Sequence, residues 1–277
     1  MERRLLEVAR RAAHEAGRLL LEAHGRVAHV ETKSSYADLV TEVDRAAERV
    51  IAGAIAREAG PGHEVLGEEA FAAGAAPVTS LDDLAAVPHL WVVDPLDGTT
   101  NFVHGVPFFA VSIAYLCRGE TRFGVIHDPV RDTWYEAVRG AGFMENGQPR
   151  RVSAEETLRR SLLATGFQYD AAGEGRLNLR HFAAVARQSR NVRALGSAAL
   201  ALALVAAGRL SGFWELRLGP WDVAAGVLMI EEAGGRVTHL DGSPFTLGRR
   251  GDIVASNGRI HDALLAVLAG VEAGDAG

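Results

Sequence analysis

The pattern of apolar residues changes near residue 153, and this change limits the possible folds more than any other feature of the chain. Before it, short apolar or aromatic runs recur with turn-forming residues between them, which is typical of an antiparallel sheet. After it, helical and strand patterns alternate, which favours layers of helix and sheet. We therefore expect an α+β protein with two layered subdomains in one compact body, residues 1–150 and 151–277.

Apolar residues at spacings of three and four predict the helices. They are expected at residues 3–24, 41–59, 178–190, 197–207, 221–233 and from 260 onward, and Ser153-Ala154-Glu155-Glu156 has the capping-box pattern of a further helix start. Strands are expected at residues 65–66, 90–93, 108–117, 124–127, 134–138, 143–145, 192–195, 213–215, 237–238 and 253–255, with hairpin turns at Gly119-Glu120, Asp132-Thr133 and Asn146-Gly147. Residues 70–88, rich in Ala, Gly and Pro, are expected to form a surface excursion with one helical turn.

The composition of the chain argues against several classes of protein. The chain has 29 Lys and Arg against 35 Asp and Glu, so its net charge of -6 attracts neither nucleic acid nor an anionic membrane. Cys117 is the only cysteine, which excludes an intramolecular disulfide and a four-sulfur metal site. The N-terminal residues lack the apolar run of a signal peptide, and the apolar run 198–207 is about half as long as a membrane span. We expect a cytoplasmic protein.

Two aspartates stand where the apolar strand at residues 90–93 ends. Asp94 and Asp97 bracket Pro95-Leu96, a spacing that can point two carboxylates and one main-chain carbonyl at a common point. Oxygen donors of this kind suit Mg2+ rather than zinc. The following residues, Gly98 to Asn101, supply a turn, hydroxyls and backbone N–H groups that can hold an anion. A cation site beside an anion site indicates a metal-bridged phosphate.

Each acidic residue also has a structural interpretation. A strand followed by Asp-x-x-Asp-Gly is by itself an ordinary turn. Asp44 completes a capping-box pattern with Thr41, and Asp222 can complement the dipole at the start of an apolar helix. Glu68 and Glu69 can be solvated. These acidic residues all lie at element boundaries beside apolar segments, however, and together they favour a common site.

The motifs of several other chemistries are missing from the sequence. It contains no His-Glu-x-x-His, no Gly-x-Ser-x-Gly, no P-loop and no Gly-x-Gly-x-x-Gly turn. Cys117, in an apolar strand, is expected in the core rather than as a nucleophile. Metal-assisted phosphoryl hydrolysis remains.

The acidic segments and their order resemble the inositol monophosphatase family of Mg2+-dependent, lithium-sensitive phosphatases. The matching motifs are Asp38-Leu39-Val40-Thr41-x-x-Asp44, Gly67-Glu68-Glu69, residues 91–102 with the sequence WVVDPLDGTTNF, and WDVAAG at 221–226 with EAGG at 232–235. They span residues 33–236, and the long aspartate motif is the most specific. The resemblance implies a layered α-β-α-β-α sandwich, a homodimer and hydrolysis of a sugar or cyclitol phosphomonoester.

The resemblance also implies ligands for two to three Mg2+ ions. Glu68, Asp94 and the Leu96 carbonyl match the ligands of the first ion. Asp94, Asp97 and Asp222 match those of the second, and Glu68 again lies near a weaker third.

The catalytic residues implied are Thr99 and Asp44, a pair that orients and deprotonates the attacking water, together with Glu68. Lys33 is the only lysine of the chain and stands at the position of a lysine in the loop of the third metal. It is therefore assigned to that loop.

The substrate contacts implied by the resemblance are Asp97, Gly98, Thr99, Arg193, Gly196, Ser197, Ala198, Glu215 and Asp222. Thr100 stands where relatives that act on 3'-phosphonucleotides or histidinol phosphate often carry lysine, and where fructose-1,6-bisphosphate relatives commonly carry an aromatic residue. The sequence thus favours myo-inositol 1-phosphate. The alternatives are those three substrates or another sugar phosphate, or a regulatory binding protein that uses this fold.

Overall fold

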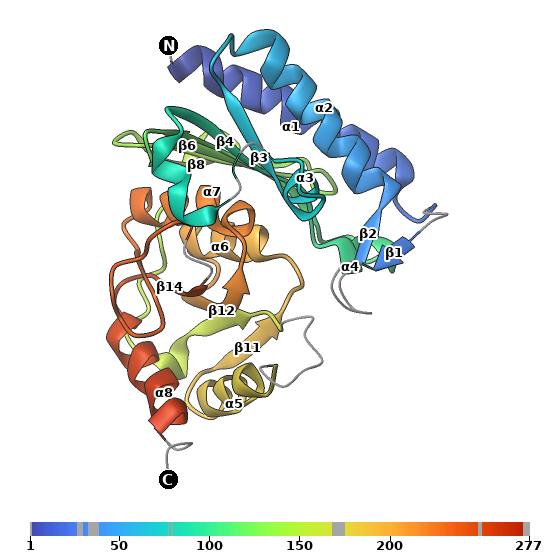
Figure 1. Ribbon diagram of the computed structural model, residues 1–277. Helices are drawn as coiled ribbons and strands as arrows, with labels where there is room; N and C mark the ends of the chain where they lie inside the picture. The colour runs from blue at the N-terminus through green and yellow to red at the C-terminus, as the bar shows by residue number, and fades with distance from the viewer. Residues whose placement is uncertain are drawn as a thin grey trace.

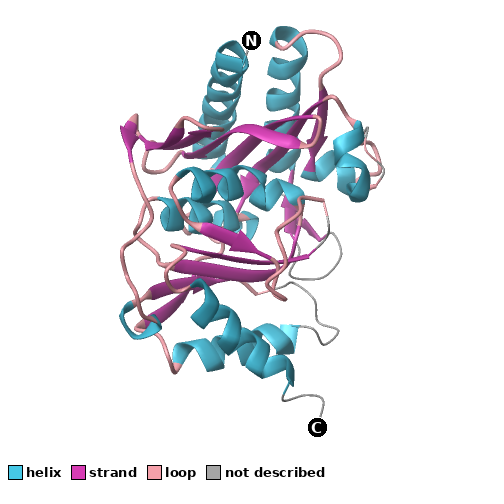
Figure 2. Ribbon diagram, turned by 90° about the vertical axis from the view of Figure 1, so that its left-hand side faces the viewer, coloured by secondary structure: helices cyan, strands magenta, loops and turns pink. Residues whose placement is uncertain are grey.

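Five layers stack in the order helix, sheet, helix, sheet, helix (Figure 1, Figure 2). They are seen in a computed structural model that describes residues 2–26, 30–32, 39–76, 78, 80–167, 175–248 and 251–273. This is the α+β sandwich that the sequence predicts. The strands of the larger sheet come from residues 64–149 and those of the smaller from residues 162–256. The domain boundary at residue 150 stays a prediction.

The larger sheet has seven strands in sequence order, of which only β3 and β4 run parallel. Trp91 and Val93 of β4 pack toward α1 and α2, whereas Leu90 and Val92 pack toward α6 and α7, because side chains alternate along a strand. Both faces are covered, so residues 90–93 of the strand are all apolar. The strands are β3 (Glu64–Gly67), β4 (His89–Asp97), β5 (Ala110–Cys117), β6 (Glu120–Asp128), β7 (Thr133–Val138), β8 (Gly142–Glu145) and β9 (Gln148–Pro149).

The smaller sheet has the order β11-β10-β12-β14-β13. The second strand, β10, is parallel to both of its neighbours, whereas β14 is antiparallel to both of its own. A separate antiparallel pair, β1 and β2, precedes α2. These strands are β1 (Val30–Thr32), β2 (Leu39–Thr41), β10 (Leu162–Thr165), β11 (Asn191–Ala194), β12 (Gly212–Leu218), β13 (Arg236–Thr238) and β14 (Gly251–Ser256).

Three pairs of helices form the other layers. α1 (Glu2–Ala23) and α2 (Glu42–Glu58) cover the outer face of the larger sheet, α6 (Ala198–Ala206) and α7 (Pro220–Glu232) lie between the sheets, and α5 (Gly175–Ala186) and α8 (His261–Ala273) cover the smaller sheet (Figure 2). Every residue of α6 except Leu204 is buried, as expected for a helix packed on all sides. Shorter helices are α3 (Glu68–Ala72), α4 (Thr99–Val103) and the 3-10 turns Leu81–Ala86 and Leu158–Arg160.

The structure corrects the sequence reading at Ser153 and at residues 162–165. Ser153 does not start a helix: its hydroxyl donates to Ser211 at 3.1 Å, and Asn257 binds both Ser153 and the Glu155 carbonyl. Tertiary contacts use the groups that a helix start would need. The strand β10 was not expected at all.

The segment 70–88 is less exposed than predicted. It contains the end of α3 and a 3-10 turn, and the side chains of Val78 and Leu84 are buried. Both belong to the core between the larger sheet and the middle helices. The helical-turn prediction therefore holds, but the segment also anchors itself in the core.

Among the residues that the structure describes, no helix combines the length and the apolar character that crossing a bilayer requires.

Candidate metal centre and active site

A bulge at the end of β4 brings two carboxylates together. Asp94 pairs with Ser112 of β5, and Asp97 pairs with Ala110, so β4 advances three residues while β5 advances two. In a regular strand Asp94 and Asp97 would point to opposite faces, and the extra residue turns both to one side. The Leu96 N–H donates to Asp94 Oδ1 at 3.0 Å and holds this turn.

A third carboxylate comes from α7, in the helix layer between the two sheets. Asp222 lies in the first turn of α7 and accepts the Gly219 N–H at 2.5 Å, so its structural role as a cap is present too. One oxygen each of Asp94, Asp97 and Asp222 lies within 4.8 Å of the other two. Glu68, the first residue of α3, lines the same cavity as Asp97 and Asp222. The four acidic residues predicted as metal ligands therefore converge.

Burial and mutual repulsion raise the pKa of these carboxyl groups. The pKa of Asp94 lies well above its usual value because the group is buried and faces Glu68, Asp97 and Asp222. Burial followed by repulsion from Glu68 raises the pKa of Asp222 in the same direction. Burial raises the pKa of Asp97 to about 6, against hydrogen bonds that lower it. A divalent cation would relieve this repulsion, and an all-oxygen donor set fits a hard cation such as Mg2+.

The Thr99 hydroxyl meets the Asp44 carboxylate beside this cluster. Thr99 Oγ1 lies 3.0 Å from Asp44 Oδ1 and 3.1 Å from the Leu96 carbonyl oxygen. Asp44 Oδ2 accepts the N–H of Thr41 at 2.9 Å and also its hydroxyl, which completes the capping box of α2. The structural and the catalytic interpretation of Asp44 are thus compatible, because each uses a different carboxylate oxygen.

Gly98 makes the turn between β4 and α4. Its φ of +102° lies in the left-handed region that side chains disfavour. A Cβ atom here would also lie 3.0 Å from the Gly196 carbonyl oxygen and 3.1 Å from that of Phe108. Both the backbone conformation and the close approach therefore require glycine.

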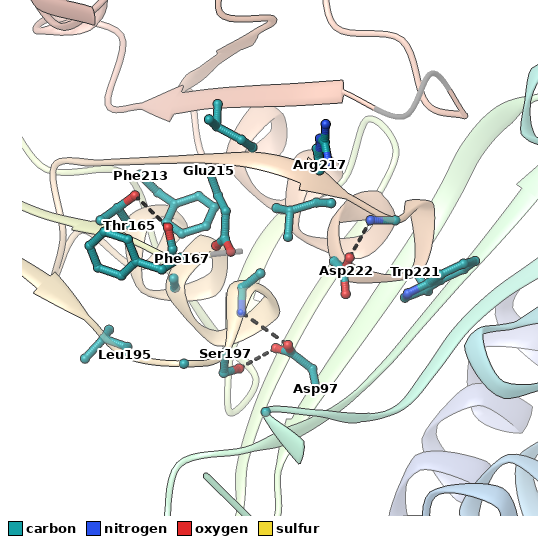
Figure 3. A pocket seen from close by; sticks show the side chains of 18 of the residues that line it. Asp97, Thr165, Phe167, Leu195, Ser197, Phe213, Glu215, Arg217, Trp221 and Asp222 are labelled. Atoms are coloured by element: carbon teal, nitrogen blue, oxygen red, sulfur yellow. Dashed lines mark hydrogen bonds between the residues drawn. The ribbon is translucent and has the colours of Figure 1, made fainter. Parts of the chain in front are cut away.

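Asp97 also connects the two halves of the chain. Its carboxylate accepts the Ser197 hydroxyl and the Ala198 N–H at 3.2 Å (Figure 3). It also accepts the Ala199 N–H at 2.8 Å, at the start of α6. Ser197 in turn accepts the Leu200 N–H at 3.3 Å as the N-cap of α6. The sequence reading placed Ser197 at the substrate, and it did not foresee this bond to Asp97.

A cavity of about 310 Å³ opens onto the carboxylates. In Figure 3, Glu215 of β12 points into it from the side opposite Asp97. Burial, and then repulsion from Asp97, raises the pKa of Glu215 to about 8. The Glu215 carboxyl occupies the space beside Gly166, where a Cβ would lie 2.1 Å from its oxygen. The cavity thus has an acidic end near Asp97 and Asp222 and a second carboxyl across from it.

The structure brings most of the predicted substrate contacts to this cavity. Thr99 and Arg193 are exceptions, because neither lines the cavity. Arg193 is exposed on β11, and its guanidinium donates to the Val192 carbonyl at 3.3 Å. Lys33 lies outside the described residues. The predicted residues that line the cavity are Glu68, Asp97, Gly98, Gly196, Ser197, Ala198, Glu215 and Asp222.

Sequence reasoning missed other residues at the site. Thr165, Gly166 and Phe167 form one wall, and they were overlooked because β10 was not predicted. Arg217 lines the cavity at a bulge of β12 with a φ of +58°, and no sequence signal marks it. Glu48 binds the start of α3, and its position one turn after Asp44 could have indicated this.

Fold and site together define a class of protein: a metal-dependent hydrolase built as a five-layer α-β-α-β-α sandwich. A family model described as the inositol monophosphatase family matches residues 1–272, and the chain belongs to this family. The resemblance drawn from the sequence motifs is therefore confirmed.

Individual relatives cover almost the whole chain. The Nus factor SuhB of Pseudomonas aeruginosa is 43% identical over 268 residues, which are 95% of either chain. The fructose-1,6-bisphosphatase/inositol-1-monophosphatase of Thermotoga maritima is 37% identical over 264 residues, again 95% of both. Among solved structures, a Thermotoga maritima IMPase superposes with a TM-score of 0.85 at 35% identity and covers 98% of both chains.

Proposed function

We propose that the chain is a Mg2+-dependent phosphomonoesterase that hydrolyses myo-inositol 1-phosphate to inositol and phosphate. The observation that carries this proposal is the convergence of Asp94, Asp97 and Asp222 within 4.8 Å at one end of a cavity. Glu215 at its other side supports a polyol substrate, since a carboxyl group can exchange hydrogen bonds with two hydroxyls. A homodimer, a cytoplasmic location and sensitivity to lithium belong to the same proposal.

The carboxylates and the Leu96 carbonyl would hold two to three Mg2+ ions, with Glu68, Asp94 and Leu96 at one site and Asp94, Asp97 and Asp222 at the next. Bound Mg2+ supplies Lewis acidity toward the phosphate and a nucleophilic water at neutral pH. No covalent enzyme intermediate is then needed.

Thr99 and Asp44 would handle the proton of the attacking water. The Thr99 hydroxyl donates to Asp44 Oδ1, so Thr99 Oγ1 can take a proton from the water while its own proton passes to the Asp44 carboxylate. The Thr41 backbone N–H holds the other oxygen of Asp44 at 2.9 Å and prevents the carboxylate from rotating. Gly98, which lines the cavity beside them, would lie against the phosphate.

Phosphate release from a panel of substrates tests the proposal. The panel contains myo-inositol 1-phosphate, fructose-1,6-bisphosphate, histidinol phosphate and 3'-phosphoadenosine 5'-phosphate, each with and without Mg2+. We expect release that depends on Mg2+ and is fastest on myo-inositol 1-phosphate, and we expect Asp94→Asn and Asp222→Asn to abolish it. Full activity in either variant would contradict the metal assignment.

Two relatives support alternative functions. The name of the Thermotoga maritima relative includes fructose-1,6-bisphosphatase, so a faster rate on that substrate would keep the chemistry and change the substrate. The Pseudomonas aeruginosa relative is named a Nus factor, which supports a regulatory binding role. If an Asp94→Asn variant of this chain retained full function in its host cell, the binding role would replace the enzymatic one.

A further inference from the structure

A carboxylate of α2 caps the start of α3. Glu48 is 8% exposed, and its two oxygens accept the N–H groups of Glu69 at 2.8 Å and Ala70 at 2.9 Å. These residues lie in the first turn of α3, where the N-cap residue Gly67 has no side chain that could accept them. Unsatisfied N–H groups at a helix start favour an anion, and their bonds to a carboxylate are strong. Glu48, a residue of α2, therefore serves as the side-chain cap that the N-cap residue of α3 cannot provide.

The close approach of the Glu48 carboxylate also explains why residue 67 is a glycine. A Cβ atom at this position would lie 2.2 Å from Glu48 Oε2 and 2.4 Å from its Cδ. The φ of Gly67 is -97°, which any residue adopts. Glycine is therefore needed here for the close approach of the carboxylate and not for the conformation of the backbone.

One turn of α2 reaches both parts of the active site. Asp44 and Glu48 are four residues apart and so lie on one face of the helix. Asp44 accepts the Thr99 hydroxyl at 3.0 Å, while Glu48 binds the segment that begins with Glu68. The distance between the Thr99 hydroxyl and the Glu68 backbone is thus set by a single rigid element.

Glu68 needs such an anchor because it faces other carboxylates. Its charge contributes to the raised pKa of both Asp94 and Asp222, and the same repulsion pushes Glu68 away from them. α3 has five residues, too few for a helix to be stable by itself. A contact from outside α3 must hold its first turn, and the two hydrogen bonds to Glu48 do so.

We propose that Glu48 is a positioning residue that holds the backbone of Glu68 so that its carboxylate reaches the metal centre. This inference rests on the proposed role of Glu68 as a Mg2+ ligand. Residues that orient metal ligands through hydrogen bonds typically change metal affinity or activity 10- to 100-fold when they are replaced. A role confined to stability would leave Mg2+ affinity unchanged.

Mg2+ binding to the substrate-free full chain tests this role by calorimetry. We expect Glu48→Gln to raise the Kd for Mg2+ by about tenfold or more, and the Mg2+ concentration for half-maximal phosphate release to rise in parallel. Asp128→Asn is the matched control, because Asp128 is also buried and accepts two backbone N–H groups, of Val130 at 3.0 Å and Arg131 at 3.1 Å. It lies outside the cavity, so it should lower the melting temperature without changing the Kd.

Gly67→Ala provides an independent arm of the experiment. The added methyl should displace the Glu48 carboxylate and raise the Kd by itself, yet add nothing in a Glu48→Ala background, because the two changes act through one contact. Additive effects would overturn the proposal, as would an unchanged Kd in folded Glu48→Gln. Glu48→Asp, which keeps the charge on a shorter side chain, replaces the Gln variant if that variant does not fold.

The two proposals can fail separately. If the wild type binds Mg2+ but hydrolyses none of the phosphates in the panel, the proposed function fails and the calorimetry still decides the role of Glu48. If the wild type binds no Mg2+, both proposals are wrong.

Discussion

Replacing Asp94 by asparagine should stabilise the metal-free protein while abolishing its activity. Asp94 is 1% exposed and faces the carboxylates of Glu68, Asp97 and Asp222. Asparagine has nearly the same shape, and its Oδ1 can still accept the Leu96 N–H that holds the turn. The substitution therefore removes one buried charge, and with it part of the repulsion, without opening a cavity.

The neighbouring Asp97 shows what an ionised carboxyl group costs in this cluster. Its pKa rises from 3.8 to about 6, and each pH unit corresponds to about 1.4 kcal/mol, so the ionised group costs about 3 kcal/mol at neutral pH. Asp94 is more deeply buried than Asp97 and its pKa is also raised. We expect the metal-free Asp94→Asn variant to exceed the wild type in free energy of unfolding at pH 8.

The sign of the pH dependence follows from the raised pKa. A carboxyl group with a higher pKa in the folded than in the unfolded chain binds protons more tightly when folded, so the wild type loses stability as the pH rises through the folded pKa. The asparagine does not titrate. The advantage of the variant should therefore vanish at a pH well below 3.8, where the carboxyl group is protonated in both states, and grow as the pH rises toward the folded pKa of Asp94.

Urea unfolding in EDTA, followed by the fluorescence of the buried Trp91 and Trp214, measures this difference. Mg2+ at 100 times its Kd should stabilise the wild type by about 2.7 kcal/mol and the variant far less. If Asp94→Asn is less stable than the wild type in EDTA at pH 8, the carboxylates do not repel one another as argued.

Three other substitutions probe separate parts of the site, and a fourth, Arg118→Gly, serves as a control away from the cavity. Thr99→Val cannot donate to Asp44 and should lower kcat, measured by phosphate release, by about 100-fold or more. The affinity for Mg2+, measured by calorimetry, should change little. Glu215→Gln should raise KM for myo-inositol 1-phosphate by about tenfold, as expected for a lost hydrogen bond to a hydroxyl. The KM for p-nitrophenyl phosphate, which has no polyol, should stay the same. An equal change for both substrates would contradict the assignment of Glu215. Arg217 and Arg118 have left-handed backbones with φ of +58° and +52°, so replacing either by glycine should raise the free energy of unfolding, measured in urea, by about 1 kcal/mol. Only Arg217→Gly, at the cavity wall, should also alter KM.

Helices, strands and the acidic motifs were predictable because their signals are local. The apolar periodicity of residues 3–24 and the run at 90–93 depend only on neighbours along the chain, and both α1 and β4 form as expected. The ligands Asp94, Asp97 and Asp222, which converge in the structure, were predictable for a related reason. The motif around Asp94 is a continuous stretch of sequence that is long enough to be specific. The capping box at Ser153 shows the limit of local signals, because contacts with Ser211 and Asn257 override it.

Only the tertiary structure decided how the site is assembled. The register of β4 against β5 places the bulge that turns Asp94 and Asp97 to one side, and the packing of α6 between the sheets makes Asp97 a cap for a helix from the other half of the chain. Glu48 likewise gains its partner from a segment that follows an intervening turn and strand. The sequence determined which elements form and which groups carry the chemistry. Their mutual placement depended on pairings between distant segments, because periodicity records which face of an element is buried and not what it is buried against.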